Sequence, residues 1–166
     1  MLDIPDNLPT PVMPNENAVD VCIIHASQRL KVDPVALKAI RLQEAGKIGS
    51  VMKNTNGSYD LGVMQINTIH MPDLKKRYRG ITWQDVAYKP CTNIAIAARM
   101  LQQRISEAGQ FWKGVGNYHS KTPKYHNKYL GLVKNRYNKL KKQRWAAKAN
   151  QLYGRVMKNK YKNKRL

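Results

Sequence analysis

The spacing of apolar residues along the chain predicts a mainly helical protein. Apolar side chains recur at helical intervals over residues 17–31, 34–45 and 93–108. Further segments carry the same interval or a typical helix start: 72–78, 82–89, 110–119 and a segment that begins at Thr122. Residues 1–16 contain prolines at four positions, which favours an extended arm.

One stretch inside the body lacks helical spacing. Residues 46–67 are rich in Gly, Asn, Ser and Tyr and end in a short apolar run, which predicts a turn-rich loop or a small hairpin. Long irregular segments in compact domains usually carry function. We therefore expect a functional site at this loop.

The helix expected just before this loop carries an acidic residue on its apolar face. Asp33, followed by proline, is a favourable helix start. Leu37, Ile40 and Glu44 then lie on one stripe. The polar residues expected to turn mostly elsewhere are Lys38, Arg41 and Gln43. Burial of Glu44 should raise its pKa, as a proton donor to a glycosidic oxygen requires. The alternative is a salt bridge at the helix C-terminus.

Few other acids are candidates for this chemistry. The chain has ten Asp and Glu against 30 Lys and Arg. Most of the acids lie in the N-terminal segment, near helix starts or on an exposed helix end: Asp3, Asp6, Glu16, Asp20, Asp33, Asp73, Asp85 and Glu107. Only Glu44 and Asp60 lack such an explanation.

Length and hydropathy predict one globular domain. The chain has 166 residues, of which 42% are hydrophobic, and its apolar runs are shorter than the roughly 18 residues that a membrane span requires. The N-terminus lacks the basic start and apolar core of a signal peptide. We therefore expect either a cytosolic protein or a mature form without its leader.

The charge is strongly positive and is concentrated at the C-terminus. A net charge of +20 requires a polyanionic setting, such as nucleic acid, an anionic membrane surface or an acidic polymer. From Lys134 to the end the sequence has many basic residues, interleaved aromatics and no acid. Such a run is either a solvated helix or tail, or an interaction surface. We treat 136–166 as a basic extension of a domain that spans 17–135.

Two cysteines are far apart in the sequence. Cys22 and Cys91 match no metal-binding spacing, so they form either one disulfide or two buried thiols. A disulfide would close a loop of about 70 residues and stabilise the fold by roughly 4 kcal/mol. No metal or other cofactor is expected.

Several spaced motifs together resemble one enzyme family. With QEAG at 43–46 and DLGVMQIN at 60–67, the chain resembles the lysozyme-like lytic transglycosylases. Three further blocks agree with the resemblance in order: CIIHAS at 22–27, PCTNIAIAARML at 90–101 and VGNYHSKTP at 115–123. The block CIIHAS is similar to the opening helix of one subgroup of this family, which serves type IV secretion, conjugation and type III secretion systems. The resemblance implies that the two cysteines are bonded and that the protein is periplasmic, with its leader removed.

The resemblance also implies a fold and a reaction. The fold would be mainly α, of the lysozyme-like α+β type, with a small loop or hairpin lining a cleft for peptidoglycan strands. Glu44 matches the catalytic acid that protonates the oxygen of the MurNAc to GlcNAc β-1,4 bond. Its carboxylate would then accept the proton of the sugar's own 6-hydroxyl, which gives 1,6-anhydro-MurNAc.

Four further residues match positions that contact the substrate in this family. Gln65 and Met64 match the cleft loop, Asn93 matches an asparagine of the long helix, and Tyr118 matches a tyrosine that faces the acid. Amides and hydroxyls can bind sugar hydroxyls, and Met and Tyr offer apolar surface to sugar rings. The alternatives are that Met64 is a core residue and that Asn93 is only a helix cap.

Two positions depart from the usual pattern. Many relatives follow the catalytic Glu with Ser, whereas this chain has Ala45 and lacks that hydroxyl. Asp60 is in register with the second carboxylate of animal-type lysozymes, so hydrolysis becomes plausible if it points into the cleft. The alternative is that Asp60 fixes the loop through backbone amides.

Two other classes of function compete with a glycan-cleaving enzyme. A nucleic-acid-binding protein would explain the charge and the basic extension, but the sequence contains no nucleic-acid-binding motif that we recognise, and nucleic acid is not the favoured partner. An inactive scaffold for peptidoglycan or a secretion component would explain Ala45. The favoured partners are glycan strands, with the basic extension free for an anionic polymer, a membrane surface or a secretion component.

Overall fold

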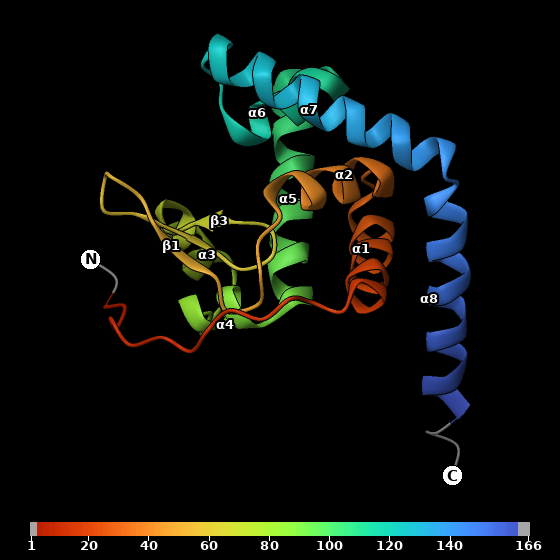
Figure 1. Ribbon diagram of the computed structural model, residues 1–166, viewed down its shortest axis with the longest axis horizontal. Coiled ribbons are helices and arrows are strands. Elements are labelled where there is room, and N and C mark those ends of the chain that lie inside the picture. Colours follow the sequence, from red (N-terminus) through yellow and green to blue (C-terminus); the bar gives the residue numbers. More distant parts are fainter. Residues whose placement is uncertain (1–2, 163–166) are drawn as a thin grey trace.

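The computed structural model describes residues 3–162, which form a helical body with one small sheet (Figure 1). The α-helices are α1 (Glu16–Leu30), α2 (Pro34–Glu44), α3 (Met71–Arg77), α4 (Trp83–Tyr88), α5 (Pro90–Ala108), α6 (Phe111–His119), α7 (Pro123–Lys142) and α8 (Trp145–Lys162). The strands are β1 (Val51–Lys53), β2 (Tyr59–Leu61) and β3 (Ile66–Asn67), and η1 (Thr68–His70) is a short 3-10 helix. The predicted mainly helical fold with a small hairpin is confirmed.

Helix α5 is the central element of the helical body (Figure 1). It packs against α1 on one side and α6 on another, and it buries Ile94, Ala97 and Leu101 completely. The helix begins at Pro90, three residues before the predicted start near Asn93. Proline suits the first helical position because its missing N–H has no partner there in any helix.

The sheet is antiparallel with the order β1-β2-β3. Its inner side is anchored by Leu61 and Ile66, which face each other across β2 and β3 and are fully buried. Asp60 and Asn67 are the neighbouring pair on the opposite face of the same strands. The hairpin therefore presents polar residues on one face while its other face joins the core.

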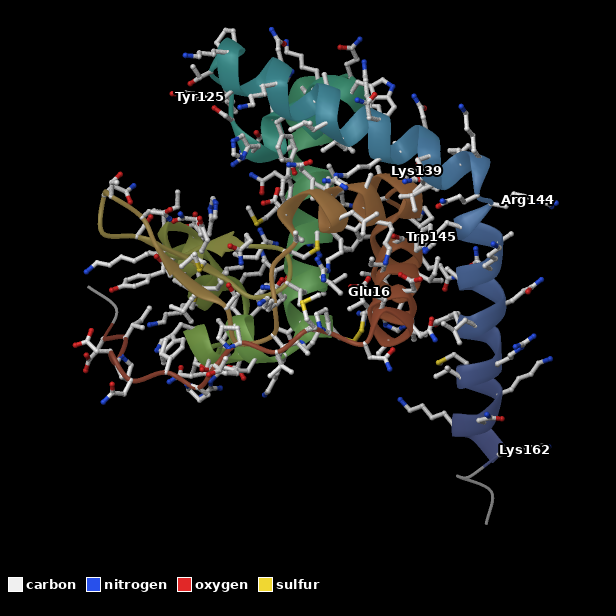
Figure 2. All side chains as sticks on the ribbon, viewed as in Figure 1. Glu16, Tyr125, Lys139, Arg144, Trp145 and Lys162 are labelled. Carbon is white, nitrogen blue, oxygen red and sulfur yellow. A yellow bond between two sulfur atoms is a disulfide. The ribbon has the colours of Figure 1, made fainter. Side chains whose placement is uncertain are left out.

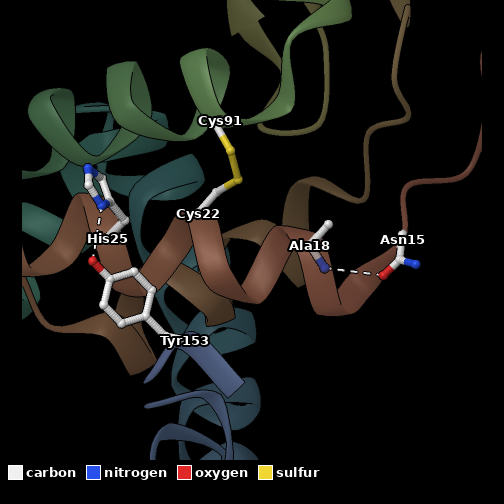
Figure 3. Close-up of a disulfide and its surroundings, with 6 residues drawn as sticks. All are labelled: Asn15, Ala18, Cys22, His25, Cys91 and Tyr153. Atoms are coloured by element: carbon white, nitrogen blue, oxygen red, sulfur yellow. Dashed lines mark hydrogen bonds between the residues drawn. A yellow bond between two sulfur atoms is a disulfide. The ribbon is translucent and has the colours of Figure 1, made fainter. Parts of the chain in front are cut away.

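A disulfide joins α1 to the first turn of α5 (Figure 3). Cys22 and Cys91 are bonded, with their Cα atoms 5.1 Å apart, as the family resemblance implies. In the loop-entropy model a link over 69 residues stabilises the fold by roughly 4 kcal/mol. The bond holds the start of the central helix against α1.

A buried ion cluster lies between α1 and α2. The prediction that Lys38 and Arg41 turn away from the core is wrong, because both are buried, with exposed fractions of 5% and 3%. Lys38 Nζ lies 2.7 Å from Glu16 and 2.6 Å from Asp20, and Arg41 donates to Glu16 at 3.0 Å. Burial is tolerated because each cation meets a carboxylate.

The basic C-terminal part is helical and folds back onto the body. Helix α7 runs through residue 135 without interruption, and the chain bends at Arg144, which has a φ of 52°. Helix α8 then packs along α1, where Trp145 Nε1 donates to Asp20 at 2.9 Å and Tyr153 contacts His25 (Figures 1 and 3). Arg144 itself extends away from the body at the bend (Figure 2).

The two ends of the chain differ in structure. Residues 3–14 contain no helix, and Val12 forms an isolated bridge with Ile48. Residues 1–2 of the expected arm and 163–166 of the basic run lie outside the described residues. Within the described range, no helix combines the length and the hydropathy needed to cross a bilayer.

Candidate active site

Glu44 is the last residue of α2 and lies where the helix ends in the loop. The next residue, Ala45, is exposed and has a left-handed backbone with φ 52°. At Gly46 a Cβ would lie 2.1 Å from the carbonyl oxygen of Gly62 and 2.7 Å from Gln65 Nε2. Only glycine permits such a close approach of the two backbone segments, which brings the end of the helix against the hairpin.

The carboxyl of Glu44 is partly buried and has one strong hydrogen-bond donor. Burial raises its pKa from 4.5 to about 7; the hydrogen bond from Tyr129 opposes this rise, and the charge of Asp60 adds to it. The Tyr129 hydroxyl donates to Glu44 Oε1 at 2.6 Å. Near neutral pH this group therefore exists in comparable protonated and ionised fractions. That is the state a general acid needs.

Glu44 lines a groove of about 450 Å³ between the helical body and the hairpin. Polar side chains from the hairpin and its turn line one part of the groove: Asn54, Thr55, Asn56, Ser58, Asp60, Gln65 and Asn67. Apolar side chains from β3, η1 and α5 also line it: Ile66, Ile69 and Met100. Amides and hydroxyls beside short apolar patches suit a carbohydrate.

Gln65 lines the groove as predicted and is held in one orientation. Its backbone φ is 51°, and its Nε2 donates to the Gly62 carbonyl at 2.8 Å and to Ser50 Oγ at 3.2 Å. Two hydrogen bonds from one amide nitrogen fix the side chain before any ligand binds. Gln65 is therefore a preorganised amide next to the acid.

Met64 and Asn93 do not reach the groove. Both are fully buried and neither lines the groove, so the prediction that they contact the substrate is wrong. Asn93 is also not a helix cap, because α5 begins three residues earlier. Its side chain accepts from the Met64 N–H at 2.7 Å and donates to the carbonyls of Leu61 at 2.8 Å and Val86 at 2.9 Å. These three hydrogen bonds tie α5 to the loop and to the end of α4.

Asp60 lies in the groove together with Glu44. It accepts a hydrogen bond from Asn67 Nδ2 at 2.7 Å, across the β2–β3 pair. The interaction that fixes it is thus a side-chain amide and not the backbone amides that we considered. Because Asp60 lines the groove, its carboxylate can contact a ligand while it accepts the hydrogen bond from Asn67.

Tyr118 lines the groove, and its hydroxyl is buried. Within the described range this oxygen has no hydrogen-bond partner. Burial, followed by the charge of Glu44, raises the pKa of Tyr118 well above its ordinary value. The hydroxyl therefore stays protonated beside the acid.

Sequence reasoning missed Tyr129 and His119. The rings of the two residues stack with centroids 4.7 Å apart, and His119 lines the groove. Tyr125, Tyr129 and Tyr137 all lie on α7, and no local signal distinguishes the one that reaches Glu44.

Comparison with known proteins gives consistent matches over most of the chain. The family model described as the transglycosylase SLT domain matches residues 21–144, a range that contains every groove residue named above. The invasion protein IagB of Salmonella typhimurium is 34% identical over 125 residues, which cover 72% of this chain and 77% of that protein. A peptidoglycan-binding-like protein of Escherichia coli O157:H7 is 35% identical over 109 residues, covering 62% and 65%. Protein IpgF of Shigella flexneri is 33% identical over 102 residues, covering 61% and 66%.

Proposed function

The chain belongs to the transglycosylase SLT domain family, and from this membership we propose that it is a lytic transglycosylase that cleaves the MurNAc to GlcNAc β-1,4 bond of peptidoglycan. The observation that carries the proposal is the buried carboxyl of Glu44, whose pKa is raised to about 7 inside a polar groove. A group with this pKa can donate a proton and later accept one at the pH where the protein works.

The reaction has two proton transfers, and both use Glu44. The protonated acid gives its proton to the bridging oxygen as the bond to the anomeric carbon breaks, and the GlcNAc part leaves as an alcohol. The 6-hydroxyl of the MurNAc ring then attacks that carbon while the Glu44 carboxylate accepts the hydroxyl proton. The 1,6-anhydro ring closes, and Glu44 is protonated again for the next cycle.

Tyr129 and the groove residues support this sequence. Tyr129 donates to Oε1, which leaves the other carboxyl oxygen to carry the transferred proton. The same hydrogen bond stabilises the carboxylate that forms after the first transfer. Because Tyr129 already orients the acid, the hydroxyl that is missing at Ala45 is not required for this purpose.

Sugar binding is assigned to the amides of the groove. Asn54, Asn56 and Gln65 offer donors and acceptors to sugar hydroxyls and N-acetyl groups, while Ile69 and Met100 offer apolar surface to ring faces. Tyr118 lines the same groove, with its buried hydroxyl next to the acid.

A hydrolytic reaction is the second candidate, because Asp60 lies in the groove and its charge acts on Glu44. A retaining hydrolase would use Asp60 as a nucleophile or to stabilise the positive charge on the sugar, a role for which lysozyme is the standard example. The Asn67 hydrogen bond to Asp60 instead supports a loop-fixing role.

Mass spectrometry of the muropeptides released from purified cell walls tests both candidates. A transglycosylase gives 1,6-anhydro ends, and a hydrolase gives reducing ends. Glu44→Gln should abolish release in either case, whereas Asp60→Asn should leave a transglycosylase substantially active. Wall release that persists in Glu44→Gln would contradict the proposal as a whole.

We further propose that the enzyme works in the periplasm and opens the wall locally for a secretion or conjugation apparatus. The disulfide supports an oxidising compartment. The similarity to a protein named for invasion is consistent with service to such an apparatus. The basic surface of α7 and α8 is assigned to an anionic wall polymer, a membrane surface or a component of that apparatus.

A further inference from the structure

A second cavity of about 450 Å³ lies beside the groove, between α3 and α5. It is continuous with the groove in its lining, because His70 and Met100 contribute to both. The reaction described above uses no other residue of this cavity. A ligand in the groove and a ligand in this cavity would thus contact the same two residues.

The cavity is lined by cations from two helices. Lys76 and Arg77 come from the end of α3, and Arg99 and Arg104 come from the middle of α5. The one carboxylate in the lining is Asp73, whose side chain is 84% exposed. Positive charge is thus concentrated inside a concave surface, where it acts more strongly on an anion than the same charge on an open helix face.

These cations are only partly matched by the protein's own acids. Asp73 lies 3.7 Å from Lys76, and Glu107 accepts from Arg104 at 3.0 Å. Among residues 3–162, no carboxylate lies within 4.0 Å of Arg77 or Arg99.

The side chain of Arg99 also has an unused donor. Its Nε is buried and has no hydrogen-bond partner among the described residues, while its Nη1 makes only a long contact of 3.5 Å with Gln102. A buried donor without a partner is costly. The Arg99 guanidinium therefore has hydrogen-bonding capacity that the described residues leave unused.

We propose that this cavity binds a carboxylate of the stem peptide that the glycan strand in the groove carries. The inference rests on the proposed function, since it requires a peptidoglycan strand in the groove. Each MurNAc of such a strand bears a peptide with free carboxylates, which projects away from the sugar chain. Guanidinium groups bind carboxylates through paired N–H donors, and Arg77 and Arg99 supply them.

The charge of the lining distinguishes this proposal from a simple extension of the sugar groove. The groove binds neutral sugar through amides, whereas the cavity offers mainly cations. Neutral sugar would gain little from two guanidinium groups. The enzyme should therefore prefer strands that keep their peptides over strands that have lost them and whose lactyl carboxylates have been converted to neutral amides.

The test is a binding measurement with the Glu44→Gln protein, so that strands are not consumed. Fluorescently labelled soluble glycan strands are used in two forms, with intact stem peptides and after amidase treatment. Because the amidase leaves a lactyl carboxylate on each MurNAc, the carboxylates of the stripped strands are converted to neutral methylamides before the measurement. Arg77→Gln and Arg99→Gln should each weaken binding of the peptide-bearing strands by roughly 5- to 10-fold, as expected for loss of a charge-assisted hydrogen bond. Binding of the stripped strands should change by less than about twofold.

Lys75→Gln is the matched control, because Lys75 is an exposed cation of α3 that does not line the cavity. It should leave both binding constants unchanged. Arg77 is exposed, so its variant tests the cavity even if Arg99→Gln disturbs the fold. Equal losses for both strand forms, or no loss for either, would overturn the inference.

The outcomes also separate this inference from the proposed function. If the wild-type protein releases anhydro-muropeptides but binds peptide-bearing and stripped strands equally, the proposed transglycosylase function is supported and the proposed peptide site is wrong. If binding depends on the peptide and on Arg77 while the wild-type protein releases no muropeptides, the proposed peptide site is supported and the proposed reaction is wrong.

Discussion

A single hydrogen bond, from Tyr129 to Glu44, adjusts the acid at the centre of the groove. Burial makes the carboxylate unfavourable, and the Tyr129 hydroxyl recovers part of that loss by donating to it. The balance holds the pKa at about 7. Without the hydroxyl, burial and the charge of Asp60 act unopposed.

Tyr129→Phe should therefore raise the pKa of Glu44 further. The alkaline limb of the pH–activity profile reports loss of the acid's proton, and it should move upward by about one unit. Maximal activity should fall about tenfold, because the acid loses its fixed orientation. The profile is measured on purified cell walls. Tyr125→Phe, at an exposed position of the same helix, should leave the profile in place. A downward shift of the limb would contradict this account.

The same carboxyl should make stability depend on pH. Its folded pKa of about 7 is higher than the ordinary 4.5, so its contribution is fully present below about pH 4.5 and is lost as the pH rises through 7. Glu44→Gln has no such loss. The variant should gain about 1 to 3 kcal/mol of unfolding free energy relative to wild type between pH 4.5 and pH 8.5. Urea unfolding at the two pH values measures the difference. If the variant and the wild type differed by the same unfolding free energy at both pH values, Glu44 would be ionised in the folded protein over this whole pH range.

Glu44 was predictable from the sequence, and its partner was not. The apolar stripe of a helix shows which acid is buried, because that stripe is a local pattern. Tyr129 is 85 residues away, and its contact with Glu44 depends on how α7 packs on α2. Met64 and Asn93 are the opposite case. Their motif was recognised, but only the packing reveals that they lie beneath the loop.

At the scale of elements, one carboxylate connects three helices. Asp20 of α1 accepts from Lys38 of α2 and from the Trp145 ring of α8. Periodicity predicted α1 and α2 but not α8, and the sequence pattern placed Lys38 away from the core and Asp20 near a helix start. A lysine on a helix is usually solvated, and its burial here depends on acids that are 18 and 22 residues away.

Asp20→Ala should destabilise the protein by about 2 to 3 kcal/mol, because it leaves Lys38 buried with one anion fewer and Trp145 without its acceptor. Asp73→Ala is the control, since the ion pair of Asp73 with Lys76 is solvent-exposed. The control should change stability by less than about 0.5 kcal/mol. Chemical denaturation of both variants gives the comparison. Similar effects of the two changes would mean that the buried cluster contributes little.

At the scale of the whole molecule, positive charge gathers on the outer side of α7 and α8. The basic run was evident in the sequence, but its helical form and its packing onto α1 were not. Leu140, Trp145 and Ala149 are buried, so truncation from residue 140 would expose apolar surface. Substitution of exposed cations is the cleaner way to test the surface. The cationic cavity also required the structure, because its two halves come from separate helices.

Replacement of Lys148, Arg155 and Lys158 by Gln should weaken sedimentation of the protein with cell walls by roughly 5- to 10-fold at low salt. Cleavage of short soluble glycans should be unchanged, because all three residues lie on α8 and none lines the groove. Replacement of Lys53, Lys75 and Lys113, exposed elsewhere, removes the same charge and should have a smaller effect. Equal losses would mean that net charge matters and the position of the charge does not.

The bond between Cys22 and Cys91 makes the stability of the protein depend on when its thiols are oxidised. Before thiol oxidation, the central helix is not covalently fastened to α1, and the chain lacks roughly 4 kcal/mol of stabilisation. In a reducing compartment the protein should thus be less stable and more protease-sensitive than the same protein in an oxidising one. Under the proposed function, the enzyme would reach its full stability only in the compartment that contains its substrate, the cell wall.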